Sequence, residues 1–385
     1  MIYLDNAAST PVHEKVIEEM IPYFKEHYGN PSSIHKHGRL ASIAVQNARK
    51  RIASLINAES NEILITSGGT ESNNTALYGI AHRNKGKHII TSSIEHDAIL
   101  EPCKRLEEEG FQITYLPVDK YGLVNPQDVE KEISPDTCLV SIMFANNEVG
   151  TIQPIAEIGK ITQEKKIIFH TDAIQAVGKT PINVKELDID LLSISSHKIN
   201  GPKGVGVLYV RKDVKIDPLI LGGGQENGLR SGTENVASIV GFGMACQLAK
   251  DNMKQNQENF RKLGVRLVSE VLKEIPYTKL NGHPEKRISN NVHFTFLGVN
   301  GEDLIIKLDE NKIAASTGSA CSVKVQKASH VLRAMGFSHE QITGSLRLTI
   351  GITNTEEDIT ETIQVLKKVV KELRTVSPYK EKYNF

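Results

Sequence analysis

The sequence predicts an α/β fold: a large domain built on a mainly parallel sheet, with a smaller α+β domain beside it. Three observations support this. The chain has 385 residues, which is long for a single hydrophobic core. Short apolar runs alternate with helical patterns between residues 60 and 210, and this βαβ rhythm is typical of parallel sheets. The runs are nearly continuous in Ile, Val and Leu, as in strands covered on both faces.

The region before the sheet is expected to be helical. Thr10 and Pro11 suit the N-cap and the first position of a helix. Apolar residues recur at every fourth position from Val12 to Phe24, and Gly29 would end this helix. A second helix is expected over about 39–57.

The sheet and the second domain follow from the same patterns. Six segments are predicted strands: 62–66, 88–92, 112–118, 138–144, 166–170 and 189–195. Helices such as 74–84 and 155–165 lie between them, and a long helical stretch from about 235 leads to the second domain. That domain mixes predicted strands (290–296 and 345–350) with helices (301–311 and 356–374). We predict a large domain over 15–255 and a small domain formed by 1–14 and 256–385.

Composition excludes several classes of protein. The 46 Lys and Arg residues balance the 46 Asp and Glu residues, so direct binding of nucleic acid or of an anionic membrane is not expected. No apolar run is long enough to span a membrane and the N-terminus lacks a basic leader, so a cytoplasmic protein is expected. The four cysteines are far apart and form no CxxC pair, which argues against disulfides and a zinc site. At least three of them are expected only to fill space.

A glycine turn between a predicted strand and a helix is a candidate phosphate site. The segment TSGGTESNNTALYG (66–79) places Gly69 and Thr70 at the start of the helix. Backbone N–H groups are free at a helix N-terminus, and they suit a phosphate. A plain capped helix is the alternative interpretation.

Two further positions follow predicted strands. Asp172 comes after the strand 166–170, at the carboxyl edge where open α/β sheets bind ligands; it can hold a cationic ring nitrogen or simply cap the next helix. Lys198 follows two hydroxyls and a histidine in SSHKINGPKG (195–204). A lysine fixed at this edge can be desolvated and form a Schiff base, whereas Lys179 and Lys203 are expected on solvated faces.

A phosphate cradle, an acidic residue at a strand end and a fixed lysine together point to pyridoxal phosphate. This cofactor needs an anchor for its phosphate, a carboxylate on its pyridinium nitrogen and a lysine partner. The sequence therefore predicts a pyridoxal phosphate site at the carboxyl edge of the sheet.

At these residues the chain resembles the cysteine desulfurases, pyridoxal phosphate enzymes of the class-V aminotransferase-like group. The resemblance runs from LDNAASTP to SLRLTIG and rests on TSGGTESNN, EHDAILEPC, ANNEVGTIQP, HTDAIQAVGK, SSHKINGPKGVG, GGGQENGLRSGTEN and STGSACS. It implies fold type I of the pyridoxal phosphate-dependent transferases, with a seven-stranded sheet. The long segment after STGSACS resembles the long-loop, housekeeping type that serves iron–sulfur cluster assembly.

The resemblance implies a role for each site residue. Lys198 would bind the cofactor covalently and act as a base, Asp172 would pair with the ring nitrogen, and Gln175 would bind the ring hydroxyl. His96 would stack on the ring and help to move protons. The phosphate would be held by Thr70, Ser195 and His197, and Gly69 and Ser196 would also contact the cofactor. Asn147 would contact the cofactor or the substrate, and Arg347 would bind the substrate carboxylate, although an interface salt bridge is an alternative for Arg347.

Two more residues depend on the resemblance alone. Thr233, in RSGTEN, would reach the cofactor phosphate of a neighbouring subunit, which implies a homodimer. Cys321, in STGSACS (316–322), would be the nucleophile and a possible transient ligand of an iron–sulfur cluster. Its small neighbours, in a loop of about 316–330, would let it carry sulfur outward; a buried inert cysteine is the alternative.

The implied function is conversion of L-cysteine to L-alanine, with the sulfur held as a persulfide on Cys321. The sulfur would pass to an iron–sulfur scaffold protein or another acceptor, for cluster assembly or tRNA thiolation. The alternatives are a selenocysteine lyase, an aminotransferase and a non-enzymatic cluster-assembly scaffold. Cys321 argues against an aminotransferase, which needs no thiol, and Lys198 argues against a scaffold.

Overall fold

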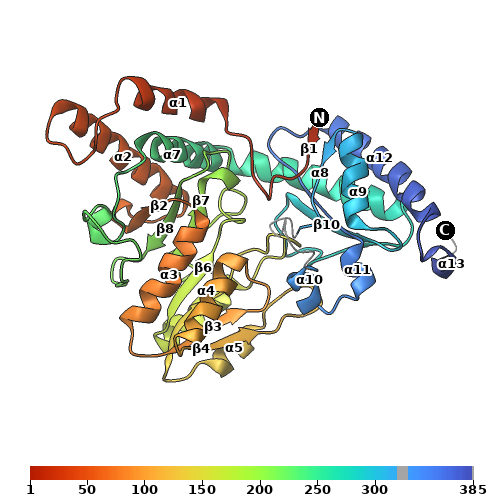
Figure 1. Cartoon of the computed structure of the whole chain (residues 1–385), viewed down its shortest axis with the longest axis horizontal. Coiled ribbons are helices and arrows are strands. Elements are labelled where there is room, and N and C mark those ends of the chain that lie inside the picture. Colours follow the sequence, from red (N-terminus) through yellow and green to blue (C-terminus); the bar gives the residue numbers. More distant parts are fainter. Residues whose placement is uncertain (319–327, 384–385) are drawn as a thin grey trace.

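A seven-stranded sheet forms the centre of the larger part of the molecule (Figure 1). The computed structural model describes residues 1–318 and 328–383. The strand order is β2-β8-β7-β6-β5-β3-β4. The strands are β2 (Ile63–Thr66), β3 (His88–Ser92), β4 (Gln112–Leu116), β5 (Thr137–Ser141), β6 (Ile168–Asp172), β7 (Leu191–Ser195) and β8 (Gly206–Val210).

The strand directions confirm a mainly parallel sheet. Neighbours from β4 through β3, β5 and β6 to β7 are parallel, whereas β8 is antiparallel to both β7 and β2. The six predicted strands correspond to β2–β7. The apolar run of β8 follows directly on a Gly-Pro turn and is not among the predicted strands.

Helices cover both faces of this sheet, as the continuous apolar strands predict. In β2, Ile63 and Ile65 belong to one core cluster and Leu64 to the other. The first cluster includes side chains of α2 (Lys36–Leu55), α6 (Ile155–Lys165) and α7 (Val236–Asp251). The second includes side chains of α3 (Gly69–Arg83) and α4 (Asp97–Glu108). The short helix α5 (Pro126–Glu132) lies against α6 and β4.

The first helix begins later than the sequence predicted. α1 spans Glu14–Lys25, with His13 as its N-cap. Thr10 does not cap it, because its backbone N–H and its hydroxyl both donate to the carbonyl of His197 (3.0 and 2.9 Å). The prediction was wrong here because Thr10 is held by a tertiary contact. The helix also ends before Gly29, while the second predicted helix is confirmed as α2.

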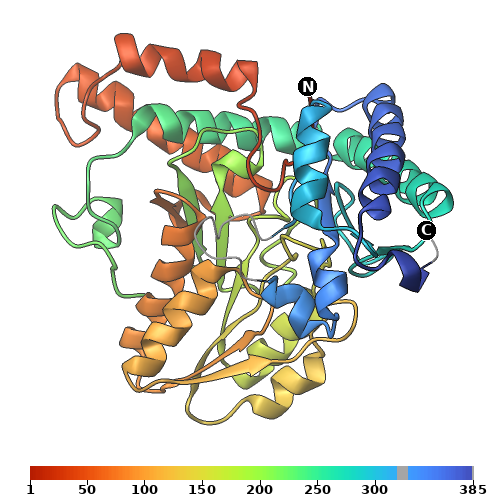
Figure 2. The same ribbon diagram turned by 45° about the vertical axis from the view of Figure 1, so that its right-hand side comes forward.

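The smaller part combines a three-stranded antiparallel sheet with long helices (Figure 2). Its strands β9 (Thr278–Leu280), β10 (Asn291–Phe296) and β12 (Ser345–Thr349) are in the order β12-β10-β9. β1 (Ile2–Tyr3) pairs in parallel with β11 (Ile313–Ala314). Helices α8 (Met253–Glu274), α9 (Gly301–Glu310) and α12 (Glu356–Thr375) pack around a separate core cluster that also contains Ile2 and Leu4.

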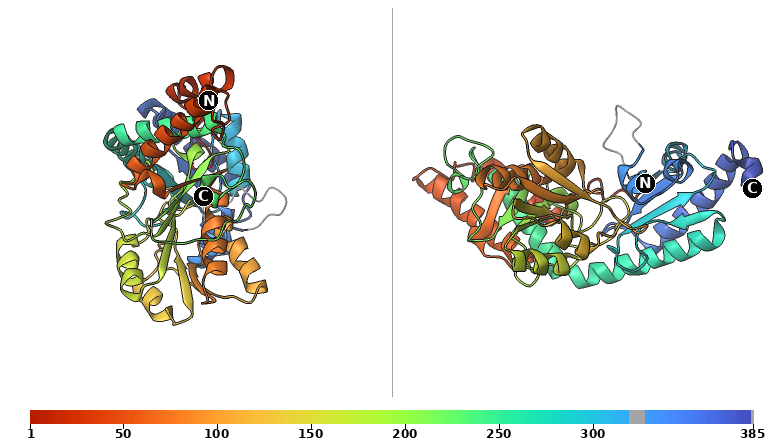
Figure 3. Two further views of the ribbon diagram at one scale, coloured as in Figure 1. Left: turned by 90° about the vertical axis from the view of Figure 1, so that its left-hand side faces the viewer. Right: turned by 90° about the horizontal axis from the view of Figure 1, so that it is seen from below.

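Two features connect the two sheets. α8 follows α7 after one residue and runs along the molecule toward the smaller sheet (Figure 3). Short helices α10 (His330–Ala334) and α11 (His339–Thr343) contribute Val331, Leu332 and Ile342 to a cluster with Ile94 and Met143. The C-terminal segment α13 (Lys380–Tyr383) closes the described chain. The domain boundaries at 15 and 255 stay a prediction.

The described part of the chain, without 319–327 and 384–385, contains no helix that is long and apolar enough to cross a bilayer.

Candidate active site

The predicted site residues follow the carboxyl ends of parallel strands. β2 and β7 run in the same direction because each is antiparallel to β8. The carboxyl ends of β2, β3, β5, β6 and β7 therefore meet at one edge of the sheet, where open α/β sheets bind their ligands. This edge carries Gly69 and Thr70 after β2, His96 after β3, Asn147 after β5, Asp172 and Gln175 at β6, and 195–198 at β7.

The N-terminal segment joins two of the predicted residues. The Nζ of Lys198 donates to the carbonyls of Ala7 and Ala8 (2.5 and 2.7 Å). The Nε2 of Gln175 donates to the same Ala7 carbonyl (3.0 Å). The lysine and the glutamine predicted from separate motifs therefore meet at one backbone oxygen. Ala7 and Ala8 belong to the segment LDNAASTP, which therefore holds both side chains in place.

Asp172 is buried at the end of β6 and both of its oxygens accept hydrogen bonds. The Nδ2 of Asn73 donates to Oδ2 (2.7 Å), and the backbone N–H of Ile174 donates to Oδ1 (3.0 Å). The Ile174 contact is the local turn bond expected if Asp172 were only a cap. The Asn73 contact fixes the carboxylate from α3 and goes beyond that role. The sequence analysis did not predict a role for Asn73; its signal was an Asn one turn into the helix after the glycines.

Glycines allow the backbone at the start of α3 to lie against β8. A Cβ on Gly206 would lie 2.7 Å from the Cα of Gly68, and a Cβ on Gly69 would overlap the side chain of Ile174. Gly68 is the N-cap of α3 and offers no side-chain cap. The first N–H groups of α3 have no partner within the helix. Thr70 is exposed beside them.

The segment after β7 contains the polar residues Ser195, Ser196 and His197, whose side chains have different neighbours. His197 lies with its Nδ1 3.2 Å from the hydroxyl of Ser9. Burial, followed by the charges of Lys198, Lys203 and Lys179, lowers the pKa of His197 to about 4, so its ring is neutral near pH 7. Ser195 and Ser196 are both buried. The hydroxyl of Ser196 lies on the side of Gly201, where a Cβ on that glycine would meet it.

His96 is the N-cap of α4. Its Nδ1 accepts a hydrogen bond from the backbone N–H of Ala98 (3.0 Å), so the neutral ring carries its proton on Nε2. The preceding residue, Glu95, is fully buried, and its Oε1 accepts from the Ser92 hydroxyl (2.6 Å) and from Met143 N–H (2.9 Å). Burial raises the pKa of Glu95 to about 8. No sequence signal distinguished this carboxyl from a surface Glu.

Arg347 is buried in β12 and already has a carboxylate partner. Its Nη2 pairs with Asp5 (2.9 Å), and its Nη1 donates to the carbonyls of Asn147 (2.9 Å) and Gly318 (3.4 Å). Its Nε is buried without a partner. Arg347 therefore forms a salt bridge within the chain; the interface salt bridge and the binding of a substrate carboxylate both stay predictions. Asn147 contributes a backbone carbonyl to this contact.

Lys179 departs from its prediction. It was expected on a solvated face but is only 6% exposed, and its Nζ donates to the Oε1 of Gln175 (3.2 Å). Burial, helped by the charges of Lys198 and Arg347, lowers its pKa to about 7. Periodicity around residue 179 failed to show this because the turn after β6 faces inward. Lys203 is exposed, as predicted.

The remaining predicted residues are less informative. Thr233 is exposed and lines a small hollow with Ser67 and Arg230 of the same chain. Cys321, with most of the predicted 316–330 loop, lies outside the described residues. The other three cysteines, Cys103, Cys138 and Cys246, are buried, and burial raises the pKa of the Cys103 and Cys138 thiols to about 12 and about 11. These three fill space, as expected.

The residues at this edge fit pyridoxal phosphate. Asp172 provides a buried carboxylate, Lys198 an amine, and the start of α3 a set of N–H groups beside glycines. Among the described residues, the buried polar atoms without a hydrogen-bond partner include several near this edge: the Oγ1 of Thr171, the Oδ1 of Asn73, the Oγ of Ser196 and the Nε of Arg347. Buried polar groups are nearly always paired, so these atoms are consistent with a site that takes a polar ligand.

Comparison with known proteins also indicates a pyridoxal phosphate-dependent family. Residues 2–361 match the family described as aminotransferase class-V. The cysteine desulfurase IscS of Methanosarcina thermophila is 54% identical over 98% of this chain and 94% of its own length. A solved NifS-like protein superposes with a TM-score of 0.90 at 39% identity, over 97% of this chain and 100% of that one. The structure described as SspA in complex with cysteine superposes with a TM-score of 0.80 at 38% identity, over 91% of this chain and 99% of that one. The chain therefore belongs to the class-V aminotransferase family, whose members depend on pyridoxal phosphate.

Proposed function

We infer that this protein is a cysteine desulfurase, which converts L-cysteine to L-alanine and retains the sulfur as a persulfide. The observation that carries this proposal is the meeting of Lys198 and Gln175 at the Ala7 carbonyl, on the sheet edge that also holds Asp172. The relatives support the choice of substrate, since one is named a cysteine desulfurase and another was solved in complex with cysteine.

Each polar group has a task in this chemistry. When bound, pyridoxal phosphate supplies an electron sink that makes the Cα proton of an amino acid acidic and weakens its Cβ–S bond. Asp172, fixed by Asn73, would keep the ring nitrogen protonated. Lys198 would hold the cofactor and then accept the Cα proton. His96, with its proton on Nε2, would be the donor. The first N–H groups of α3, with Thr70 and His197, would bind the phosphate.

Arg347 is the candidate for the substrate carboxylate. A guanidinium binds a planar carboxylate through two parallel N–H groups, and its unpartnered Nε is free to contribute one of them. Binding of the substrate would then compete with Asp5 for Nη2.

Cys321 would accept the sulfur. Its thiolate attacks the substrate sulfur; the Cβ–S bond breaks and an S–S bond forms, so the persulfide sulfur is oxidised and Cβ is reduced. Protons from the site complete alanine, and cysteine plus thiol becomes alanine plus persulfide with no other reactant. A thiolate of an acceptor protein can then take the outer sulfur. An iron–sulfur scaffold is the partner proposed for this step, and transient cluster ligation by Cys321 stays a prediction.

We extend the proposal to a homodimer. Apolar side chains are exposed on α1, on α2 and on the turn between them, including Phe24 (64%), Tyr28 (70%), Ile34 (91%) and Ile43 (58%). Exposed apolar patches of this kind mark protein contacts. A second copy of the chain is the proposed partner, with Thr233 contributing to the neighbour's phosphate site.

The competing functions are separated by one set of assays. The purified protein, supplied with pyridoxal phosphate, is incubated with L-cysteine or with selenocysteine, and alanine is measured. A desulfurase forms alanine from cysteine and needs Cys321, so Cys321→Ser should stop persulfide formation. Alanine formed only from selenocysteine would indicate a lyase. No alanine from either substrate, in a protein that binds the cofactor, would favour the scaffold.

A further inference from the structure

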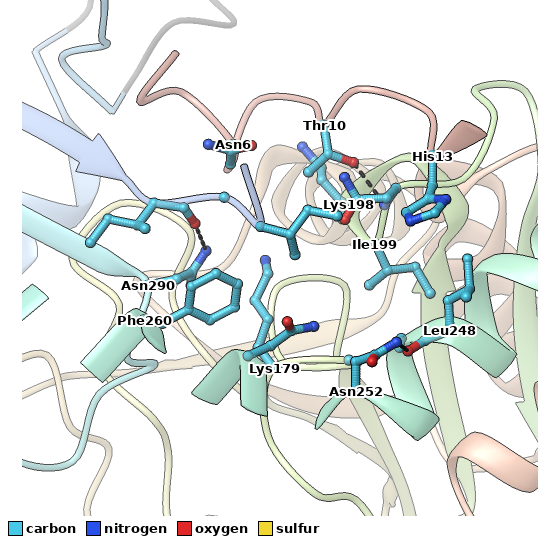
Figure 4. Close-up of a pocket in the computed structure, with 17 residues that line it drawn as sticks. Asn6, Thr10, His13, Lys179, Lys198, Ile199, Leu248, Asn252, Phe260 and Asn290 are labelled. Carbon is cyan, nitrogen blue, oxygen red and sulfur yellow. Dashed lines mark hydrogen bonds between the residues drawn. The ribbon is translucent and has the colours of Figure 1, made fainter. Parts of the chain in front are cut away.

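Lys179 is a buried amine in a pocket behind the predicted active-site lysine. The pocket has a volume of about 230 Å³ and lies among the N-terminal segment, α7 and α8, with Lys198 also on its wall. Figure 4 shows Lys179 extending into the pocket, with Phe260 on one side of it and Asn252 on the other. Burying an amine is costly unless it is hydrogen-bonded, and among the described residues the Nζ of Lys179 donates to Gln175.

The amide of Gln175 has two chemically different ends. The charged ammonium group of lysine is a donor only, with no acceptor. The Oε1 of Gln175 must therefore face Lys179 (3.2 Å), and its NH2 group must face the Ala7 carbonyl (3.0 Å). A carbonyl is an acceptor only, so the two contacts agree on one orientation of the amide. Nε2 carries a second hydrogen besides the one that faces Ala7, and Lys198 donates to the same Ala7 carbonyl.

We propose that Lys179 is a positioning residue for the cofactor site: it fixes the amide of Gln175 so that this side chain presents an N–H, and not a carbonyl oxygen, to the cofactor. Without Lys179 the Oε1 of Gln175 loses its donor, so a flip that presents Oε1 to the cofactor, where it would repel an oxygen on the ring, becomes less costly. The inference rests on the proposed function, because it takes Gln175 to be the residue that contacts the ring hydroxyl.

The structure argues against two other roles for Lys179. Within residues 1–318 and 328–383 no Asp or Glu forms an ion pair with it, so it is not half of a buried salt bridge. An anion-binding role also fits poorly, because the amides of Asn6, Asn252 and Asn290 on the pocket wall already donate to backbone carbonyls. With its pKa of about 7, Lys179 is a donor only in its charged form; the neutral amine can also accept, but the Ala7 carbonyl still requires the NH2 end of Gln175 and leaves Oε1 for Lys179.

A double-mutant cycle on cofactor binding tests the proposal. Apo protein is titrated with pyridoxal phosphate, and the dissociation constant and the absorption maximum of the bound cofactor are recorded. Loss of one oriented hydrogen bond predicts that Lys179→Met weakens cofactor binding by about tenfold and shifts the absorption maximum. Gln175→Ala should do the same. The double variant should be no weaker than Gln175→Ala alone, because both changes remove one interaction.

Control variants separate orientation from packing. Lys179→Arg keeps a donor-only group, and the adjoining pocket has room for the larger side chain, so it should restore most of the affinity. Lys160→Met, on the exposed face of α6, should behave as wild type. If Lys179→Met does not fold, Lys179→Gln gives the same comparison, since a group that both donates and accepts no longer imposes one orientation.

Two results would overturn the inference: wild-type affinity and spectrum in Lys179→Met, or additive losses in the double variant. Both presuppose a wild-type protein that binds cofactor and makes alanine. A wild type that does neither would instead contradict the proposed function.

Discussion

Asp172 is a carboxylate that the fold prevents from reorienting. Asn73 and the Ile174 N–H occupy one lone pair on each of its oxygens, and the side chain is buried. A group held in this way loses no further rotamer freedom when a ring nitrogen arrives, and such preorganisation is where enzymes gain most from electrostatics. The same logic applies to Lys198, which is held by two backbone carbonyls.

Asn73→Ala tests whether the orientation of Asp172 matters. The change leaves a buried carboxylate oxygen without its donor, which should lower the free energy of unfolding by about 1–3 kcal/mol and weaken cofactor binding. Denaturant unfolding and cofactor titration measure the two effects. Asn84→Ala, at the exposed end of the same helix, is the matched control. Unchanged affinity for the cofactor in Asn73→Ala would show that Asp172 does not depend on this contact.

Lys198→Ala tests the proposed base. Removing the amine deletes both the attachment of the cofactor and the acceptor for the Cα proton. Alanine formation should fall by about a thousandfold or more, and the exposed-lysine variant Lys160→Met should retain full activity. Alanine release from cysteine under saturating pyridoxal phosphate measures the change. A Lys198→Ala protein with more than a few per cent of wild-type turnover would exclude Lys198 as the base.

The two lysines show what sequence can and cannot predict at this scale. Lys198 was found because it stands between strand-end hydroxyls and a Gly-Pro turn, a local pattern with a chemical reason. Lys179 was placed wrongly on the surface, because its burial depends on α8 and the N-terminal segment folding over the turn after β6. No window of sequence around residue 179 contains those elements.

At the scale of elements, the turn from β3 into α4 buries a carboxyl group for which the folded state favours the protonated, uncharged form. Glu95 is fully buried and its pKa is raised to about 8 by burial. The pKa of this carboxyl is near 4.5 in the unfolded chain and about 8 in the folded protein. Between these two pH values the folded state therefore keeps a proton that the unfolded state has lost. In that window the folded state holds more protons than the unfolded state, so this group lowers stability as pH rises.

Glu95→Gln should remove that pH dependence. The amide keeps an acceptor for Ser92 and Met143 and carries no charge to desolvate. The stability of the variant relative to wild type should rise from about pH 5 to about pH 8, by up to about 1.4 kcal/mol per pH unit. Unfolding in denaturant at several pH values measures it, with Glu101→Gln, an exposed residue of α4, as control. A constant difference across this range would contradict the raised pKa.

Sequence periodicity predicted most elements but not all of their ends. The six strands β2–β7 follow from apolar runs, since a strand covered on both faces must be apolar throughout. The start of α1 did not follow from its capping signal, because Thr10 donates to His197 on a distant turn instead. Capping preferences are worth about 1 kcal/mol, so one tertiary hydrogen bond is enough to move a helix end.

At the scale of the whole molecule, the exposed apolar surface of α1 and α2 is the feature that a monomer does not explain. We propose that this surface is covered by a second copy, and that the division into 15–255 and the two flanking segments describes the units of each subunit. Neither proposal follows from a propensity or a motif. Both depend on which surfaces contact each other in the folded protein. Sequence patterns indicate such contacts only at residues such as Thr233, where the resemblance to a family implies one.

Phe24→Asp together with Ile34→Glu should weaken the proposed dimer. Two charges in an apolar contact leave buried, unpaired groups, so sedimentation should shift from dimer toward monomer as the concentration falls. Lys50→Asp, also exposed but on another part of α2, should leave the dimer intact. If the wild-type protein sediments as an active monomer at every concentration, neither the dimer nor the shared role of Thr233 is correct.

The central claim is that sulfur leaves cysteine at the sheet edge and arrives on Cys321. The most direct test incubates the holoenzyme with one equivalent of L-cysteine, quenches the reaction, and measures alanine together with the mass of the peptide that contains Cys321. We predict one alanine for each added sulfur atom on that peptide, and neither product in Lys198→Ala. Alanine formed at the wild-type rate by Cys321→Ser, with the added sulfur on another cysteine or on none, would contradict it.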